Sequence, residues 1–193
     1  MAAADDAPVV TVRNRAELRA WLSERHATGS TTWLAAFRKH HPDHLAYEAI
    51  VEELLCWGWI DSLPRALDAD RSMLMIAPRN PKSAWSALNK AHVDRARKTG
   101  AMTAAGEAKI AIAVANGQWD FLNDVDALIA PADLLAALDA KGQRDFWEAM
   151  PKSVRRGTLE WIKTAKTPVT RAKRIDDVTT SAENGLRPGP FRR

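Results

Sequence analysis

The chain has 193 residues, of which 46% are hydrophobic and 27% are charged, and its formal net charge is +4. This length suits one large domain or a core with a small added subdomain, and the hydrophobic fraction excludes disorder over most of the chain. No apolar run approaches the roughly 20 residues of a membrane-spanning helix, so we expect no membrane span. The N-terminus lacks the basic and apolar segments of a secretory signal, and the lone Cys56 fits a reducing compartment. We therefore expect a cytoplasmic protein.

The positive charge is concentrated at the C-terminal end. Residues 151–193 contain eleven Lys and Arg against four Asp and Glu, a net charge of +7, which leaves −3 for residues 1–150. A basic region of this kind can meet nucleic acid or an acidic partner, but a solvated helix face is the more common explanation. A phosphate-contacting surface over Arg155–Arg174 is kept as an alternative function.

The first half of the chain alternates strand and helix patterns. Asn14 and Glu17 have the spacing of a helix N-cap with a reaching carboxylate, and Tyr47 begins a stretch whose large apolar residues repeat with helical period. Gly58 ends that stretch, and Pro64 predicts an edge position or a bulge for the strand that follows. The predicted elements are a strand at 9–12, a helix at 15–28, a strand at 31–37, a helix at 47–57, and a hairpin of strands at 59–63 and 72–76.

The second half contains helical patterns only. The predicted helices begin near residues 83, 103, 131, 144, 153 and 168. This order predicts an α+β fold, with a small mixed β-sheet and two helices in the N-terminal half and an all-helical C-terminal half. We divide the chain into a disordered N-terminus (1–8), an α+β core with its first trailing helices (9–122), a helical subdomain (123–185) and a flexible tail (186–193).

Two short segments carry the candidate functional residues. Asp61 follows an apolar run, where an isolated carboxylate is costly unless it is paired. Arg79 and Lys82 precede the helix that we expect to begin at Ser83, and anions are favoured at the first turn of a helix. The alternative is a salt bridge from Arg79 to an acid such as Asp61, with Lys82 in solvent. The anion site that we predict consists of Arg79, Lys82 and Ser83 and is lined by Tyr47, Glu48, Glu52, Trp59, Asp61 and Trp85.

Other residues with reactive side chains have simpler explanations. Glu48 and Glu52 lie one helical turn apart and can hold a metal or divide acid and base roles, but a solvated helix face is the more common case. Cys56 lies between apolar residues, which indicates a buried hydrophobe rather than a nucleophile. A histidine cluster in the next loop favours an exposed polar loop over a metal site; its members are His40, His41 and His44. The sequence has no nucleotide-binding loop, HExxH motif or paired cysteines, so we expect no metal and no cofactor.

Several motifs together resemble a known bacterial family. They are Tyr47-Glu48-x3-Glu52, Cys56-x-Gly58-Trp59-Ile60-Asp61, Arg79-x-Pro81-Lys82-Ser83-x-Trp85, Gly100-x-Met102-Thr103-x-x-Gly106, Trp119-Asp120 and Trp161-Ile162-x3-Lys166-x5-Ala172-x-Arg174-Ile175. Their order and spacing, over roughly residues 10–180, resemble the YdeI/OmpD-associated proteins, also called bacteriocin-protection proteins. The resemblance implies protection against cationic antimicrobial peptides or association with an outer-membrane porin. It carries over no catalytic residues.

These patterns favour a non-catalytic binding or stress-protection module, whose partner is a small anionic ligand or an acidic molecule. The first alternative is a nucleic-acid-associated protein that uses the basic C-terminal region. The lesser alternative is a small carboxylate-dependent hydrolase or transferase with Asp61 or Glu48 as the base.

Overall fold

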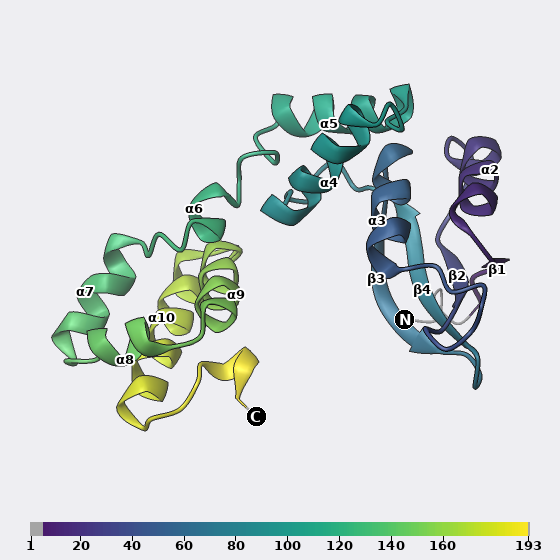
Figure 1. Ribbon diagram of the computed structural model, residues 1–193. Helices are drawn as coiled ribbons and strands as arrows, with labels where there is room; N and C mark the ends of the chain where they lie inside the picture. Colours follow the sequence, from purple (N-terminus) through teal and green to yellow (C-terminus); the bar gives the residue numbers. More distant parts are fainter. Residues whose placement is uncertain (1–5, 193) are drawn as a thin grey trace. The chain divides into compact units, whose positions relative to one another are not determined.

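Strands and helices alternate through the first half of the chain. The computed structural model describes residues 6–192 (Figure 1); residues 1–5 of the predicted disordered N-terminus, and residue 193, lie outside the described part. The chain divides between Phe121 and Leu122 into two compact units, here named unit 1 and unit 2. Unit 1 contains β1 (Val9–Val12), α2 (Arg15–Arg25), β2 (Thr32–Phe37), α3 (Tyr47–Cys56), β3 (Trp59–Ala66), β4 (Arg71–Pro78), α4 (Ala87–Lys98) and α5 (Ala104–Ala115). Unit 2 contains α6 (Asn123–Asp126), α7 (Ala132–Ala140), α8 (Arg144–Ala149), α9 (Lys152–Lys163), α10 (Pro168–Glu183) and the 3₁₀ turn η1 (Gly189–Phe191).

The strands of unit 1 form one mixed sheet. Within residues 6–192 its four strands lie in the order β1-β2-β4-β3, with β1 parallel to β2 and the other two pairings antiparallel. The predicted α+β class, a mixed sheet with helices followed by a helical half, is therefore confirmed. β3 is an edge strand, and its register with β4 shifts between Asp61 and Pro64. Proline has no N–H for the ladder, which explains both the edge position and the irregularity.

One face of this sheet is covered by α2 and α3. α2 begins with a capping box, because the Asn14 side chain accepts from the Glu17 amide and the Glu17 carboxylate accepts from the Arg13 amide, each at 2.9 Å. Fully burying a Leu or Ile side chain contributes about 1.5–3 kcal/mol, so this layer supplies much of the stability of unit 1. The apolar layer consists of Leu18, Leu22, Ile50 and Leu54 of the helices with Val12, Leu34 and Ile76 of the strands.

Helix α3 is packed on two sides. Ile50 and Leu54 contact the sheet, while Val51 and Leu55 join a second apolar cluster that contains residues of α4 and α5. All seven residues from Ile50 to Cys56 are buried. The apolar stripe predicted for this helix is therefore divided between two layers, and the acidic residues within it are enclosed as well.

A glycine allows α5 to approach the end of α3. A Cβ built on Gly106 would lie 2.4 Å from the carbonyl oxygen of Cys56, closer than real Cβ contacts. The same carbonyl accepts a hydrogen bond from the hydroxyl of Thr103, the N-cap of α5, at 2.6 Å. The hydrogen bond from Thr103 holds the start of α5 against the end of α3. The two backbones can approach this closely because Gly106 has no side chain.

Unit 2 is built from short helices whose buried residues recur at helical spacing. Leu134 and Leu138 of α7 are both 0% exposed, and α7 packs on α10, which also packs on α9. The last residues, for which the composition predicts flexibility, have contacts of their own: the Gly189 amide donates to Asp177 at 2.7 Å, and Arg192 donates to the same carboxylate at 2.5 Å. In the described part of the chain, no helix is both long and apolar enough to cross a membrane.

Candidate functional site

The arginine of the predicted anion site is buried. Arg79 is 4% exposed, its guanidinium lies 3.9 Å from the centroid of the Trp85 ring, and it donates to the carbonyl of Ala84 at 2.6 Å. Burial lowers the pKa of Arg79 to about 10. These contacts hold the loop between β4 and α4 in place, and they leave little of the guanidinium for a ligand in solvent.

The helix after this arginine does not begin at Ser83. α4 begins at Ala87, and its N-cap is Ser86, which accepts from the Asn89 amide at 3.3 Å. The Asn80 side chain instead accepts from the Lys82 amide at 2.9 Å, which makes a turn around Pro81 and delays the helix. The prediction that the helix begins at Ser83 was therefore wrong. The predicted anion site consequently has no helix N-terminus at Ser83 to contribute amide donors. Binding by Arg79, Lys82 and Ser83 stays a prediction.

Asp61 is paired with a tyrosine rather than with an arginine. The Tyr47 hydroxyl donates to the Asp61 carboxylate at 2.7 Å. Burial of the ring is the main cause, and this hydrogen bond the second, of a pKa of Tyr47 that is raised to about 12. Among residues 6–192 no ion pair joins Arg79 to Asp61, so the salt bridge that we gave as the alternative is not formed.

The glutamates of α3 form a charge network rather than a solvated face. Glu53 is 0% exposed and accepts from Arg15 at 2.7 Å and from Arg19 at 2.8 Å. Glu52, 9% exposed, contacts Arg15 at 3.0 Å and accepts from Arg95 at 3.0 Å. Burial alone would raise the pKa of Glu52, but hydrogen bonds and charges from the two arginines lower it below its ordinary value. The predicted solvated face holds for Glu48, which is exposed, and was wrong for Glu52 because α3 is packed on two sides.

Other predicted site residues belong to the core. Trp59 is 0% exposed and donates from its indole to the carbonyl of His26 at 3.2 Å, so it cannot line an open site. Trp85 is 1% exposed beneath Arg79. Cys56 is 0% exposed, as predicted for a buried hydrophobe, and burial raises the pKa of its thiol to about 11. In the described residues, the histidines of the 40–44 loop and the nearby acids form no set of three metal ligands.

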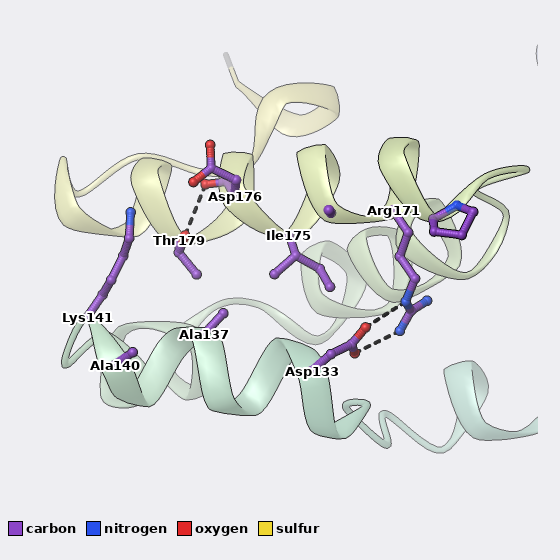
Figure 2. Close-up of a pocket in the computed structure, with 10 residues that line it drawn as sticks. Asp133, Ala137, Ala140, Lys141, Arg171, Ile175, Asp176 and Thr179 are labelled. Atoms are coloured by element: carbon purple, nitrogen blue, oxygen red, sulfur yellow. Dashed lines mark hydrogen bonds and ion pairs between the residues drawn. The ribbon is translucent and has the colours of Figure 1, made fainter.

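A groove lies between α7 and α10 of unit 2. It encloses about 550 Å³ and is here named the α7–α10 groove (Figure 2). Its walls carry the small side chains of Ala137, Ala140 and Ala172 together with Ile175. Helices pack about 8–10 Å apart, so alanines at facing positions leave a trough between two helices that are otherwise in contact. Alanine has the highest helix propensity, so the small side chains that form the groove do not destabilise α7 or α10 as helices.

Charged residues mark the rim of this groove. Arg171 of α10 donates twice to the carboxylate of Asp133 of α7, at 2.7 and 2.8 Å, and this pair closes one end (Figure 2). The hydrogen bonds from Arg171 hold the pKa of Asp133 below its ordinary value. At the other end Lys141 donates to Glu183 at 3.0 Å. Among residues 6–192 the carboxylate of Asp176 on the groove wall has no ion-pair or hydrogen-bond partner.

Much of the basic C-terminal charge is neutralised inside unit 2. Arg156 contacts Asp126 and Glu160, each at 2.7 Å, and Lys163 contacts Asp124 at 2.5 Å. Because α6–α8 supply acidic residues, residues 122–193 carry 13 cations against 10 acids, a net charge of +3. The net +7 of residues 151–193 is therefore a property of the sequence segment more than of the folded unit, which weakens the nucleic-acid alternative.

The sequence patterns did not reveal the groove, although they contained one signal for it. Ala172 and Ile175 belong to the motif that carries the family resemblance, and both line the groove. Ala137 and Ala140 alternate along α7 with the buried leucines, so they are displaced from the face that enters the core. Only the packing of α7 on α10 shows that these alanines face each other across a space.

Comparisons with known proteins divide the chain as the units do. A family model described as a domain of unknown function (DUF8412) matches residues 10–109, and one described as "Bacteriocin-protection, YdeI or OmpD-Associated" matches residues 127–185. The motifs at residues 47–106 therefore lie in the first match and the motif at 161–175 in the second. Searches of curated proteins and of solved structures found no match. Unit 2 is similar to the bacteriocin-protection, YdeI or OmpD-associated family over the matched residues, and the chain belongs to the DUF8412 family, whose model matches about half of it.

Proposed function

We propose that the chain is a non-catalytic binding protein with a protective role, and that unit 2 binds an amphipathic helical peptide in the α7–α10 groove. The observation that carries this proposal is the open apolar groove of about 550 Å³ within the segment that matches the bacteriocin-protection family. Grooves between two helices commonly receive a third helix by its apolar face. The lone, buried Cys56 supports a cytoplasmic setting for this role.

The shape of the groove supports a helix as its occupant. Ala137 and Ala140 lie on one side, and Ala172 and Ile175 lie on the other, each pair at helical spacing. α7 has nine residues, a length of about 13 Å, so the groove can contact two to three turns of a peptide helix. Alanine side chains permit the close approach of an incoming backbone, and Ile175 supplies an apolar contact.

The charge of the rim supports a cationic peptide. Asp133 is neutralised by Arg171, and Lys141 by Glu183, which leaves Asp176 as the wall residue with an unpaired charge. A basic side chain of the peptide would pair with Asp176 at the edge of the groove. An exposed pair of this kind contributes about 0.2–1 kcal/mol, so most of the affinity comes from apolar contact.

Fluorescence anisotropy tests the proposal. The ligand is a fluorescein-labelled Lys/Leu peptide of about 12 residues that forms an amphipathic helix, about one turn longer than the groove wall. The matched ligand has the same composition in a scrambled order that destroys the apolar face. We expect saturable binding of the amphipathic peptide and weak binding of the scrambled one.

Three variants locate the binding. Ala172→Arg places a cation in the groove at an exposed helix position, and we expect it to weaken binding about tenfold or more. Asp176→Asn removes the unpaired charge and should weaken binding by about threefold. The control is Asp145→Asn, an exposed acid of α8 outside the groove, which should leave binding unchanged. Equal binding of both peptides, or equal binding by the wild type and Ala172→Arg, would refute the proposal.

A further inference from the structure

A second cavity lies in unit 1, beside the N-terminus of α3. It encloses about 260 Å³ and is here named the α3 pocket. Its apolar part consists of Ala36, Ile50 and Leu74, while Arg38, Lys39 and His44 supply its polar side. An apolar floor beside a few convergent polar groups is the usual composition of a small-molecule site.

The cations of the α3 pocket have no counter-charge. Among residues 6–192 no acid forms an ion pair with Arg38 or Lys39, and the Nε of Arg38 is buried without any hydrogen-bond partner. A buried donor without an acceptor lowers the stability of the folded state. Arg38 lines the pocket, and no acid of the described residues forms an ion pair with its guanidinium, so an anionic ligand would supply the missing counter-charge.

Three acids near the pocket are turned toward other partners. Asp70 contacts the Nε2 of His40 at 3.1 Å, Asp43 lies 3.9 Å from His41, and Asp61 accepts from the Tyr47 hydroxyl at 2.7 Å. The nearest remaining acid on α3 is Glu48, in the first turn. Glu48 is exposed, so its repulsion of an anion would be screened by water.

The start of α3 adds further donors. Its N-cap is Ala46, which cannot cap the helix through a side chain. In the described residues the amides of Tyr47 and Glu48 have no acceptor, and such free amides carry the partial positive charge of a helix N-terminus. Tyr47 itself lines the pocket, and its hydrogen bond to Asp61 fixes the ring as one wall.

We propose that the α3 pocket binds a small organic oxyanion that carries a short apolar group, such as a medium-chain carboxylate. The oxyanion accepts from Arg38, from Lys39 and from the free amides of α3. The apolar group lies on Ala36, Ile50 and Leu74. The volume of about 260 Å³ lies just below the roughly 300–1,000 Å³ of drug-sized sites, so it suits a small ligand.

The single tyrosine of the chain gives a site-specific probe. Because Tyr47 is the only tyrosine in the sequence, ring-¹³C-tyrosine labelling of the full chain yields one reporter, and that reporter is on the pocket wall. Hexanoate, acetate, inorganic phosphate and chloride are titrated at constant ionic strength. We expect a saturable shift of the Tyr47 resonance with hexanoate and a weaker one with acetate. A stronger response to phosphate would overturn the need for an apolar group.

Substitutions test the role of the cations. Arg38→Met keeps the aliphatic stem and removes the charge, and we expect it to weaken hexanoate binding about tenfold or more. Lys39→Met, at an exposed position that should not affect folding, is expected to weaken binding about threefold. The control is Arg13→Met, an exposed arginine outside the pocket, which should bind as the wild type does. No saturable shift in the wild type, or equal affinity in Lys39→Met and wild type, would overturn the proposal.

Discussion

The buried glutamate of α3 offers the sharpest test of how unit 1 is held together. The Glu53 side chain is 0% exposed and accepts three hydrogen bonds, from Arg15 at 2.7 Å, Arg19 at 2.8 Å and the Trp57 indole at 3.1 Å. The substitution Glu53→Ala removes the anion and leaves two guanidinium groups without this partner. Removing one partner of a buried ion pair costs about 3–5 kcal/mol.

The structure places the expected cost at the lower end of that range. The side chains of Arg15 and Arg19 are 37% and 39% exposed, so water can hydrate them after the substitution, and Arg15 keeps Glu52 at 3.0 Å. We therefore expect Glu53→Ala to lower the free energy of unfolding by about 3 kcal/mol. That is a large part of the roughly 5–15 kcal/mol that stabilises a typical domain.

Urea denaturation measures this change, because urea leaves charge interactions unscreened. The midpoint and slope of the transition give the free energy of unfolding for the wild type and each variant. The control is Glu48→Ala, the same substitution at an exposed position of the same helix, for which we expect a change within about 0.5 kcal/mol. If Glu53→Ala costs less than about 1 kcal/mol, the network is not a stabilising contact and our reasoning fails.

Two further predictions concern α3 and its contact with α5. Gly106→Ala would stabilise an ordinary helix by up to about 1 kcal/mol, but its Cβ would meet the backbone of Cys56 at 2.4 Å, so we expect destabilisation by about 1–3 kcal/mol in urea melts. In Gly157→Ala the Cβ would meet the movable Phe191 ring instead, so this control should cost less; the reverse order would contradict the reasoning. For Glu52, whose pKa is lowered in the folded state, the stabilisation is complete above the ordinary pKa of about 4.3 and is lost as the pH falls through the folded value. The urea midpoint should therefore fall between pH 6 and about pH 3, and by less in Glu52→Gln; equal losses would argue against the lowered pKa.

Local patterns predicted the elements well wherever the signal was itself local. The capping box of Asn14 and Glu17 and the strand irregularity at Pro64 both occur as expected, because each depends on a few neighbouring residues. The start of α4 was misplaced because two serines, Ser83 and Ser86, can each cap a helix. The turn made by Asn80 decides between them.

The candidate sites were harder to predict because they depend on which elements pack together. The spacing of Glu48 and Glu52 predicted that Glu52 lies on a solvated helix face, because a helix that packs on one side only exposes its other side to water. The second layer, formed by α4 and α5, encloses that face and brings Arg95 to it. Similarly, Arg79 had the sequence context of an anion ligand, but the ring of Trp85 covers its guanidinium.

The sequence by itself determined the order of strands and helices, the α+β class and the resemblance of unit 2 to the bacteriocin-protection family, because these follow from hydrophobic period, turn residues and motif spacing. The tertiary structure alone decided which charges are neutralised and which remain unpaired. Asp133 and Arg171 are 38 residues apart, and the contacts between them arise only from the packing of α7 on α10. The same packing leaves Asp176 unpaired and opens the groove, while the packing of α3 on the sheet forms the pocket beside Arg38. A cavity is space that side chains do not fill, and that space is set by how whole elements meet.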